Sequence, residues 1–544
     1  MSERILVAVA WPYANYLLHV GQVAGAYLPA DIFARYQRLI GNEVLMVSGS
    51  DCHGTPITVT ADRENVSPKD IVDRYHPKIL EAWEKIGISF DLFTTTLTEN
   101  HYETTQDVFT KLLSEGYLYT DKQAQLYDPE SDRFLPDRYV EGICPLCSYK
   151  DARGDQCDSC GAQLDAVDLI EPRSIISGAN PEIRESEHFF LRLSAFEEKL
   201  REWVGSQNHW RRNVKNFTLG VLDEGLKDRA ITRDISWGVP VPIDGYESKR
   251  IYVWFDAVIG YLSAAKEWAA SNESPESWKA FWEDENTRSY YFIGKDNIVF
   301  HTIIWPAMLL GYGNLNLPYN VPANQYVNFS KGQKQSKSKG TGNWILDLLD
   351  TYDPDVIRFY LTSILPETSD SEFQEEELIR SNNEMLIATW GNLVNRVFAM
   401  IHKNFSGEMP SCNNISTESI SLLSEIDSAF ETIGNAYAAC EFRTALRESL
   451  RIAQLTNRYL DTRAPWKAIK EDPEHTAETL NISIQAISGI AKLLHPILPH
   501  STTELFENLG FDSEDIGKNW SRNSVPEGTR LAKSKALYSK LESD

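Results

Sequence analysis

The N-terminal part of the chain alternates between short apolar runs and longer segments with helical spacing. Residues 3–10 (ERILVAVA) and 42–51 (NEVLMVSGSD) are apolar runs with the length of buried strands. Residues 19–41 carry apolar positions at helical spacing and stop at Gly41, which predicts a helix. A second helix is predicted from Ser67 and Pro68, which cap and start it, to Gly87, which ends it. This order of strands and helices predicts a parallel sheet that binds ligands at the carboxyl ends of its strands.

The pattern is interrupted and later returns. From about Gly116 the chain breaks into short pieces with turn residues and four cysteines, which indicates an inserted domain of mixed structure. Strand and helix signals return in residues 250–262 (RIYVWFDAVIGYL) and 289–310 (SYYFIGKDNIVFHTIIWPAMLL). After about Glu372 only helical periods remain, which points to a helical bundle. The last residues, 534–544 (SKALYSKLESD), are expected to form a short polar tail.

These signals define one fold class and five segments. We expect an α/β protein with a Rossmann-like nucleotide-binding parallel sheet, split by a zinc-knuckle insertion and followed by an all-α helical bundle. The expected segments are the first half of the nucleotide-binding domain (1–115), the insertion (116–235), the second half (236–325), a lysine-loop and stem-contact region (326–372) and the helical domain (373–544).

Composition fits a folded protein of several domains. The chain has 544 residues, of which 42% are hydrophobic and 24% charged, so disorder is excluded as its main state. No signal peptide is recognisable, and no stretch reaches the roughly 18–20 apolar residues of a membrane helix, so a soluble, cytoplasmic protein without a membrane partner is expected. The net charge of -25 argues against a nucleic-acid partner but leaves room for local basic strips.

Four cysteines predict a metal site in the insertion. Two CxxC pairs, Cys144 with Cys147 and Cys157 with Cys160, are separated by nine residues. This spacing is typical of a knuckle that brings four thiolates around one tetrahedral Zn²⁺, which in a closed site is structural. Disulfides or a redox CxxC are the alternatives; a reducing compartment disfavours disulfides, and two adjacent pairs are unusual for a redox site. Three further cysteines are isolated and are not expected to be ligands: Cys52, Cys412 and Cys440.

Two segments suggest a site for a polyanion. His19 and Gly21 follow the first strand and open a helix, where exposed N–H groups and the helix dipole favour a phosphate. Much later, KGQKQSKSKG places Lys331, Lys334, Lys337 and Lys339 in a Gly- and Ser-rich loop. Taken singly, each segment has an ordinary explanation, a structural histidine in one case and a solvated loop in the other.

Together these segments resemble a known pair of signatures. HVGQ (residues 19–22) and KQSKS (334–338) look like the HIGH and KMSKS motifs of class I aminoacyl-tRNA synthetases. AWPYAN, GSDCHGTP, YVWFDAVIGY, FIGKDNIVFH and WPAM resemble the methionine-specific members over nearly the whole chain, and the cysteine knuckle matches the zinc insert of that family. The sequence departs from the family pattern at Gln22, where the motif has His, at Gln335, where it has Met, and at Val258, where Pro is common.

The resemblance implies an activity and a set of site residues. It implies the ATP-dependent attachment of L-methionine to methionine tRNA through a methionyl-adenylate, with Mg²⁺ accompanying ATP. Catalysis would involve His19, Gln22, Lys334 and Lys337, and ATP binding would add Gly21, Ser336 and Ser338. The methionine pocket would comprise Ala10, Trp11, Tyr13, Asp51, Trp254, Ala257, Tyr261 and His301. Lys295 and Asp296 follow a late strand near this site without a definite role.

The helical domain would recognise the anticodon. The positions that match the family's CAU-reading residues are Asn392, Arg396, Pro465 and Trp466. A packing role between helices is an equal alternative for the tryptophan. A monomer is expected, because no appended oligonucleotide-binding domain follows the bundle. The competing functions are another class I synthetase, for example a cysteine-specific one, and a non-catalytic RNA-binding relative.

Overall fold

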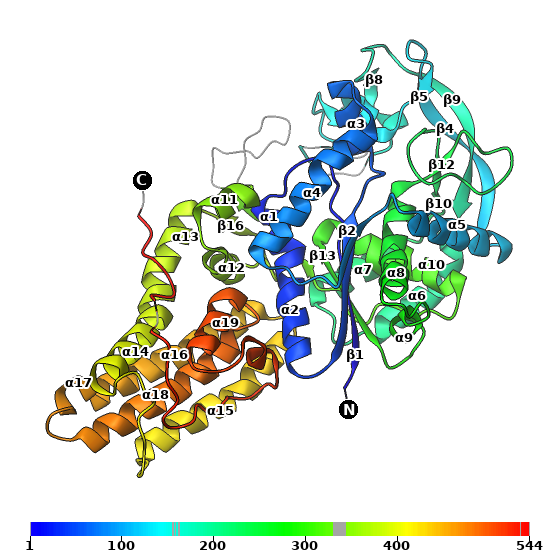
Figure 1. Cartoon of the computed structure of the whole chain (residues 1–544). Helices are drawn as coiled ribbons and strands as arrows, with labels where there is room; N and C mark the ends of the chain where they lie inside the picture. The colour runs from blue at the N-terminus through cyan, green and yellow to red at the C-terminus, as the bar shows by residue number, and fades with distance from the viewer. Residues whose placement is uncertain are drawn as a thin grey trace.

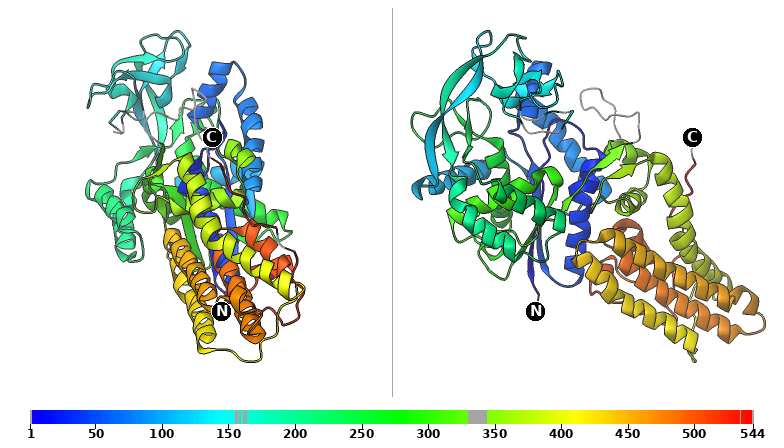
Figure 2. Two further views of the ribbon diagram at one scale, coloured as in Figure 1. Left: turned by 90° about the vertical axis from the view of Figure 1, so that its left-hand side faces the viewer. Right: turned by 180° about the vertical axis from the view of Figure 1, so that it is seen from behind.

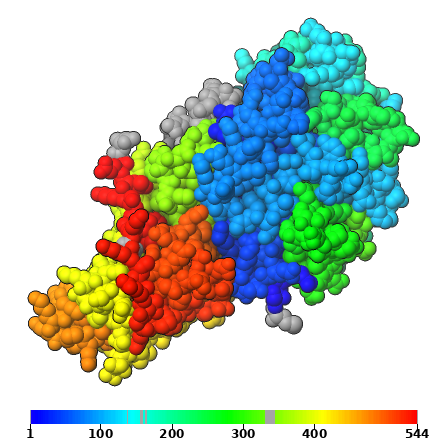
Figure 3. Space-filling view, in the orientation of Figure 1, coloured from blue at the N-terminus to red at the C-terminus, as the bar shows by residue number. Residues whose placement is uncertain are grey.

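The computed structural model of the chain describes residues 2–154, 157, 159–160, 164–329, 344–533 and 535–542. A lobe built around a parallel sheet joins a second lobe of long helices (Figure 1), and the space-filling view shows the same two parts (Figure 3). The whole predicted lysine loop lies outside the described residues, including Lys331, Lys334, Ser336, Lys337, Ser338 and Lys339.

Five parallel strands form the central sheet, in the order β14-β13-β1-β2-β3. The strands are β1 (Arg4–Val9), β2 (Glu43–Ser50), β3 (Leu92–Thr95), β13 (Arg288–Gly294) and β14 (Ala323–Asn324). β1 pairs with β2 on one side and with β13 on the other, so strands far apart in the chain are neighbours. This confirms the predicted parallel sheet that is split by an insertion.

Helices cover both faces of the sheet, as expected for buried parallel strands. In Figures 1 and 2, α2 and α4 lie on the side of the helical lobe, and α5, α8 and α10 lie on the opposite side. Successive side chains of β1 point to opposite faces, so Ile5, Val7 and Val9 enter one core and Leu6 and Ala8 enter the other. The helical elements of this lobe, including the π-helical turns η1 and η6, are α1 (Val20–Gln22), η1 (Val23–Tyr27), α2 (Leu28–Leu39), α3 (Thr55–Glu64), α4 (Pro68–Ile86), α5 (Glu99–Ser114), α8 (Val253–Ser271), α9 (Trp278–Trp282), η5 (Lys295–Asn297), η6 (Phe300–Ile304) and α10 (Trp305–Tyr312).

Helix α4 shows how local sequence fixes an element. The Ser67 side chain accepts the N–H of Asp70, and the Asp70 carboxylate accepts the N–H of Ser67, which closes a capping box. Pro68 occupies the first helical position, and Gly87 ends the helix with φ of 76°. The helix predicted from Ser67 to Gly87 is therefore confirmed at both ends.

The insertion lies between α5 and α8 and has its own small core. One of its sheets has the order β10-β9-β4-β5 and another the order β7-β6-β8. Leu126, Val140, Cys144 and Cys157 are buried in the core of this insertion. The elements are β4 (Leu118–Asp128), β5 (Arg133–Phe134), η2 (Asp137–Tyr139), β6 (Val140–Ile143), β7 (Ala152–Arg153), η3 (Ala166–Asp168), β8 (Ile170–Ser174), β9 (Glu182–Leu191), η4 (Leu193–Phe196), α6 (Glu197–Ser206), α7 (Arg212–Asp223), β10 (Arg229–Ala230), β11 (Thr232–Arg233) and β12 (Arg250–Ile251).

The helical lobe follows a short connecting region. In that region β15 (Val327–Phe329) pairs with β16 (Ser371–Phe373), and the helices are α11 (Ile345–Thr351) and α12 (Pro354–Ser363). The lobe itself contains α13 (Glu375–Ser381), η7 (Asn382–Gly391), α14 (Asn392–Asn404), α15 (Thr417–Ala438), α16 (Phe442–Arg463), α17 (Pro465–Ala468), α18 (Pro473–Leu494), α19 (Pro499–Asn508) and η8 (Ser513–Gly517). α15, α16 and α18 pack against one another, which confirms the predicted bundle. None of the helices in the described part of the chain is both long and apolar enough to span a membrane.

The C-terminal segment differs from the polar tail that the sequence suggested. Tyr538 is buried, and its hydroxyl lies 2.7 Å from the Ser501 hydroxyl. The backbone on either side is held by amides of η7, since Asn382 donates to the Ser539 carbonyl and Asn383 donates to the Leu541 carbonyl. One aromatic anchor and two side-chain amides hold this segment, and Leu537 and Leu541 pack against the core.

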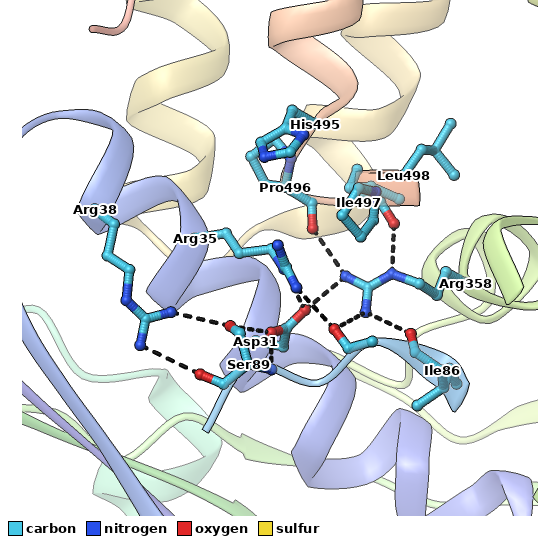
Figure 4. A network of polar contacts seen from close by, with 12 residues as sticks. Asp31, Arg35, Arg38, Ile86, Ser89, Arg358, His495, Pro496, Ile497 and Leu498 are labelled. Carbon is cyan, nitrogen blue, oxygen red and sulfur yellow. Dashed lines mark hydrogen bonds and ion pairs between the residues drawn. The ribbon is translucent and has the colours of Figure 1, made fainter. Parts of the chain in front are cut away.

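A buried ion pair joins the two lobes (Figure 4). Arg358 of α12 and Asp31 of α2 are fully buried and lie 2.7 Å apart. The same guanidinium donates to the carbonyls of Ile497 and Pro496 in the helical lobe. Because every polar group in this centre has a hydrogen-bonding partner, the buried charges are compensated.

Candidate active site

The segments that leave β1 and β2 meet at the carboxyl edge of the sheet. Tyr13 and Asp51 form a parallel backbone bridge, with the Asp51 N–H donating to the Pro12 carbonyl at 2.8 Å. The Ala10 N–H donates to the carbonyl of Phe292 in β13 at 3.0 Å. Residues from three strands are thus brought together at the edge where ligands of such sheets bind.

Trp11 fits between two glycines. A Cβ atom on Gly49 would lie 2.2 Å from Trp11 Cζ3, and one on Gly260 would lie 2.7 Å from its Cζ2. The indole faces the ring of Tyr261 edge-on at 6.5 Å. Close approach of the indole therefore requires glycine at both positions.

Tyr261 and His301 form a neutral polar pair at the bottom of this region. The Tyr261 hydroxyl and His301 Nε2 are 2.8 Å apart, and His301 Nδ1 lies 2.8 Å from the Asn297 carbonyl. A carbonyl can only accept, so Nδ1 carries the proton and Nε2 accepts from the tyrosine. Burial lowers the pKa of His301 to about 4, and the pair is uncharged at neutral pH.

A cleft opens beside these residues. Tyr13, His53 and Trp254 line about 600 Å³ of space that is partly open to solvent. Trp254 stacks on Phe300 with ring centroids 4.1 Å apart. Ala257 is half-buried one helical turn before Tyr261 on α8. The structure therefore gathers all eight predicted pocket residues around one edge of the sheet.

A buried hydrogen-bonded chain borders the pocket and had not been predicted. Asp256 accepts from His53 Nδ1 at 2.6 Å and from His101 Nε2 at 2.5 Å, and all three residues are buried. Their ligand atoms are close enough together for a metal ion, but both carboxylate oxygens lie at hydrogen-bonding distance from an imidazole. His101 also lies 6.3 Å from the Trp11 ring. His53 and Asp256 belong to the motifs GSDCHGTP and YVWFDAVIGY, whereas no motif marks His101.

Burial and the nearby Asp256 set the electrostatics of Asp51. The Asp51 carboxylate accepts the backbone N–H of His53 at 3.1 Å. Burial, and next the charge of Asp256, raise the pKa of Asp51 to about 7. Burial alone would also raise the pKa of Asp256, but the two histidines lower it below its usual range. Asp256 therefore stays ionised, and Asp51 is close to its midpoint at neutral pH.

His19 closes the start of the first helix. Its Nδ1 accepts the Gln22 N–H at 3.3 Å, while Gln22 Oε1 accepts the His19 N–H at 3.2 Å. The imidazole also faces Phe329 at 6.3 Å and Trp344 at 6.4 Å between ring centroids. These two residues flank the lysine loop in sequence, and both lie beside His19.

A second polar group lies at the end of β13. The Tyr326 hydroxyl donates to the Asp296 carboxylate at 2.5 Å, and Lys295 pairs with Asp370 at 3.0 Å. The Lys295 ammonium sits 3.9 Å from the centre of the Tyr326 ring. Lys295 and Asp296, for which the sequence suggested no role, are therefore held by Asp370 and Tyr326, which directly precede β16 and β15.

The four knuckle cysteines converge in the insertion. The sulfurs of Cys144 and Cys160 are 3.9 Å apart, and those of Cys147 and Cys157 are 3.5 Å apart. Four thiolates at about 2.3 Å from a tetrahedral metal would be separated by about 3.8 Å. All four are free of disulfides. The cluster could therefore hold a metal ion.

The predicted anticodon residues also come together. Arg396 of α14 pairs with Asp461 of α16 at 2.7 Å and lies 5.1 Å from the Trp466 ring. Trp466 is 43% exposed, which argues against the packing alternative. Pro465 is buried and starts α17, and Asn392 is exposed one turn before Arg396.

Family models match the chain in two parts. Residues 5–398 match the model of tRNA synthetases class I (M), and residues 409–544 match that of the anticodon binding domain of methionyl tRNA ligase. The fold is similar to that of Mycobacterium tuberculosis methionyl-tRNA synthetase bound by methionyl-adenylate, with a TM-score of 0.82 and 23% identity over 99% of this chain and 100% of that one. The chain belongs to the class I tRNA synthetases.

Relatives that match nearly the whole chain show which family within this class it belongs to. The methionine–tRNA ligase of Dehalococcoides mccartyi (strain CBDB1) is 51% identical over 100% of this chain and 98% of its own length. That of Thermomicrobium roseum is 52% identical over 95% of this chain and 88% of its own length. Within its class the chain is a member of the methionine–tRNA ligase family, an enzyme that attaches methionine to tRNA at the expense of ATP. The resemblance inferred from the motifs is confirmed, and the competing functions are set aside.

Proposed function

We propose that methionine and ATP react at the carboxyl edge of the sheet to give methionyl-adenylate and pyrophosphate. A ribose hydroxyl of the terminal tRNA nucleotide then attacks the carbonyl carbon of the adenylate, which forms the ester of methionine with the tRNA and releases AMP. The observation that carries this proposal is Asp51, a buried carboxylate beside an aromatic, uncharged pocket. An ammonium group taken out of water needs such a partner.

The methionine side chain would enter the region of Trp11, Tyr261 and His301. Aromatic walls suit a polarizable thioether, with sulfur–aromatic contacts worth about 0.3–1.5 kcal/mol. The Tyr261 hydroxyl donates its hydrogen bond to His301, and both side chains are neutral. The pocket therefore presents no charge to an apolar side chain. Trp254 and Ala257 of α8, together with Tyr13, would line the path between the cleft and Asp51.

ATP would bind between the first helix and the lysine loop. His19, Gly21 and Gln22 lie at the helix start, and we assign Lys334 and Lys337, with Ser336 and Ser338, to the phosphates. To catalyse nucleotidyl transfer, a protein must position the reactants and neutralise the negative charge of the phosphates. Mg²⁺ bound with ATP would supply further charge compensation on the phosphates.

We assign one structural Zn²⁺ to the four cysteines, which would hold the insertion together.

Arg396, Asn392 and Trp466 are our candidates for reading a CAU anticodon, with Pro465 fixing the position of the tryptophan. A tryptophan face for stacking and polar groups for base edges are typical of proteins that bind single-stranded RNA loops. A role in protein synthesis would place the enzyme in the cytoplasm.

Pyrophosphate exchange tests the proposal. Exchange into ATP should depend on methionine and should be absent with cysteine. His19→Ala should lower the exchange rate by roughly 10²–10³-fold, the usual loss for one transition-state contact. Exchange that is supported by cysteine, or that is unchanged in the His19 variant, would contradict the assignment.

A further inference from the structure

A single residue with an unusual backbone conformation separates α16 from α17. Ala464 has φ of 42° and ψ of 55°, the left-handed conformation, and it caps both the end of α16 and the start of α17. A residue with a Cβ atom rarely adopts this conformation, and glycine is the usual residue at such a helix end. Strain of this kind persists only where the surrounding structure enforces it, and it is frequent at functional sites.

The turn at Ala464 leads directly into the exposed tryptophan. Pro465 starts α17 and is buried, whereas the ring of Trp466 is exposed and its centre lies 5.1 Å from Arg396 Cζ. The Lys467 N–H donates to the Ala464 carbonyl at 2.9 Å, so α17 is hydrogen-bonded to the turn. Figure 1 shows α17 at the end of the bundle far from the sheet. The conformation of Ala464 therefore sets the direction in which the chain presents the indole.

A polar cluster fixes the residue before the turn. The Arg463 guanidinium pairs with the Glu478 carboxylate of α18 and also donates to the Thr479 hydroxyl at 3.3 Å. The Arg463 carbonyl accepts a hydrogen bond from His475 Nε2 at 2.8 Å. Both the side chain and the backbone of Arg463 are thus held by residues of α18.

The carboxylate of this cluster is satisfied on its other side as well. Glu478 accepts from the Ser416 N–H at 2.7 Å and from the hydroxyls of Ser416 and Ser419, each at 2.5 Å. The Ser419 hydroxyl lies 2.7 Å from the Tyr459 hydroxyl of α16. Only 13% of the Arg463 side chain and 10% of the Glu478 side chain are exposed. A buried network whose members are satisfied is rigid, and this one ties α15, α16 and α18 together next to the turn.

We propose that Ala464 is a positioning residue, held left-handed by the cluster around Arg463, that presets the ring of Trp466 for stacking on an anticodon base. The inference rests on the proposed function, in which Trp466 contacts the anticodon. A ring that is already in place loses less conformational freedom on binding, and it adapts less readily to a wrong base. The strain at Ala464 then serves base discrimination rather than the stability of the bundle.

Ala464→Gly tests the inference. Glycine adopts the same conformation without strain but also adopts others, so the turn gains freedom while the bundle is not weakened. The ratio of the Kd values for methionine tRNA and for a tRNA with an altered anticodon measures discrimination. We expect discrimination to fall by about 2–10-fold, the cost of immobilising one side chain on binding.

Stability and adenylate formation separate positioning from structural damage in this variant. The melting temperature should stay at the wild-type value or rise, because strain is released. Methionine-dependent pyrophosphate exchange should be unchanged, since it takes place in the other lobe. If melting temperature, exchange and discrimination fell together, Ala464 would be a structural residue and the inference would be overturned.

Asn314→Gly is the matched control. Asn314 is an exposed left-handed residue with φ of 59° that follows α10 in the sheet-containing lobe. The same gain of backbone freedom at this position should leave discrimination between the two tRNAs unchanged. An equal loss in both glycine variants would show that the turn at Ala464 has no specific role.

A double variant shows whether Ala464 acts through the tryptophan. In a Trp466→Ala background, Ala464→Gly should cause no further loss of discrimination, because the ring that the turn positions is absent. A further loss of the same size would contradict the inference. If Trp466→Ala alone leaves discrimination unchanged, the proposed anticodon role of Trp466 is wrong and the inference falls with it. If Trp466→Ala lowers discrimination and Ala464→Gly does not, only the inference is wrong.

Discussion

Single residues at the sheet edge owe their properties to partners from distant segments. Asp51 follows β2, but its pKa depends on Asp256 of α8 and on the backbone of His53. The motifs predicted that Asp51 belongs to the site because strand ends meet in a parallel sheet. The partnership of Asp256 with His101 could not be predicted, since it depends on how α5 packs against α8.

Methionine affinity should depend on the charge of Asp51. The pKa of Asp51 is raised to about 7, so the carboxylate is increasingly protonated below that pH and cannot pair with an ammonium. We expect the Kd for methionine to rise as pH falls from 8 to 6, approaching tenfold per unit below the pKa. Titration calorimetry at several pH values measures this.

The neighbours of Asp51 do not account for the same profile. His301, with a pKa of about 4, stays neutral over this range, and the pKa of Asp256 is lowered, so that it stays ionised. The remaining neighbours are His53 and Cys52. Burial raises the pKa of the Cys52 thiol well above this range. Asp51→Asn should therefore weaken binding and abolish the pH dependence. A profile that persists in this variant would show that the titrating group is not Asp51.

The glycines around Trp11 offer a steric test of the pocket. Gly260→Ala would place a methyl group 2.7 Å from the indole, which must move. Overpacking of this kind costs about 1–3 kcal/mol, and we expect the KM for methionine to rise more than the KM for ATP. Gly25→Ala is the control, because its Cβ would meet nothing within 4 Å. Equal effects of both changes on the KM for methionine would show that Trp11 does not shape the pocket.

At the scale of elements, local signals predicted regular structure well and irregular structure poorly. α4 was predicted from Ser67, Pro68 and Gly87 because caps act within one turn of the helix. The tail was misjudged because its order depends on Tyr538 reaching Ser501, a contact that no local pattern encodes. In the insertion, the cysteine spacing predicted a cluster that the sulfur distances support.

Metal content tests the insertion as an element. Protein purified without a chelator should contain one zinc per chain, as measured by mass spectrometry of the metal. Cys144→Ser should lose the metal and destabilise the insertion, whose core contains this residue. Cys412→Ser is the matched control, because this cysteine lies outside the cluster and should leave the zinc in place. Wild-type protein without metal would contradict the zinc assignment.

At the scale of the whole molecule, one core and one ion pair hold the two lobes together. The hydrophobic cluster that includes Ile5 of β1 continues without a break to Leu505 of α19. Arg358 and Asp31 cross the same boundary (Figure 4). The sequence predicted both lobes from their periods, but it gave no sign of this joint, because an arginine and an aspartate so far apart carry no shared local pattern. The two candidate sites therefore lie in different lobes that share one continuous core.

This separation allows the functions of the lobes to be measured independently. If the exposed ring of Trp466 stacks on an anticodon base, Trp466→Ala should remove about 1–3 kcal/mol of tRNA affinity. Charging of tRNA should fall accordingly, while methionine-dependent pyrophosphate exchange, which takes place in the other lobe, stays near wild type. Because the side chain is 43% exposed, the melting temperature should change little.

Phe217→Ala provides the control, since Phe217 is an aromatic residue of α7 with a comparable exposure of 48%. Its loss should affect neither tRNA affinity nor discrimination between anticodons. In the Trp466 variant, discrimination between methionine tRNA and a tRNA with an altered anticodon should decrease, because the stacking partner is lost. If exchange, charging and melting temperature all fell together in that variant, Trp466 would be a structural residue and the anticodon site would have to be sought elsewhere on the helical lobe.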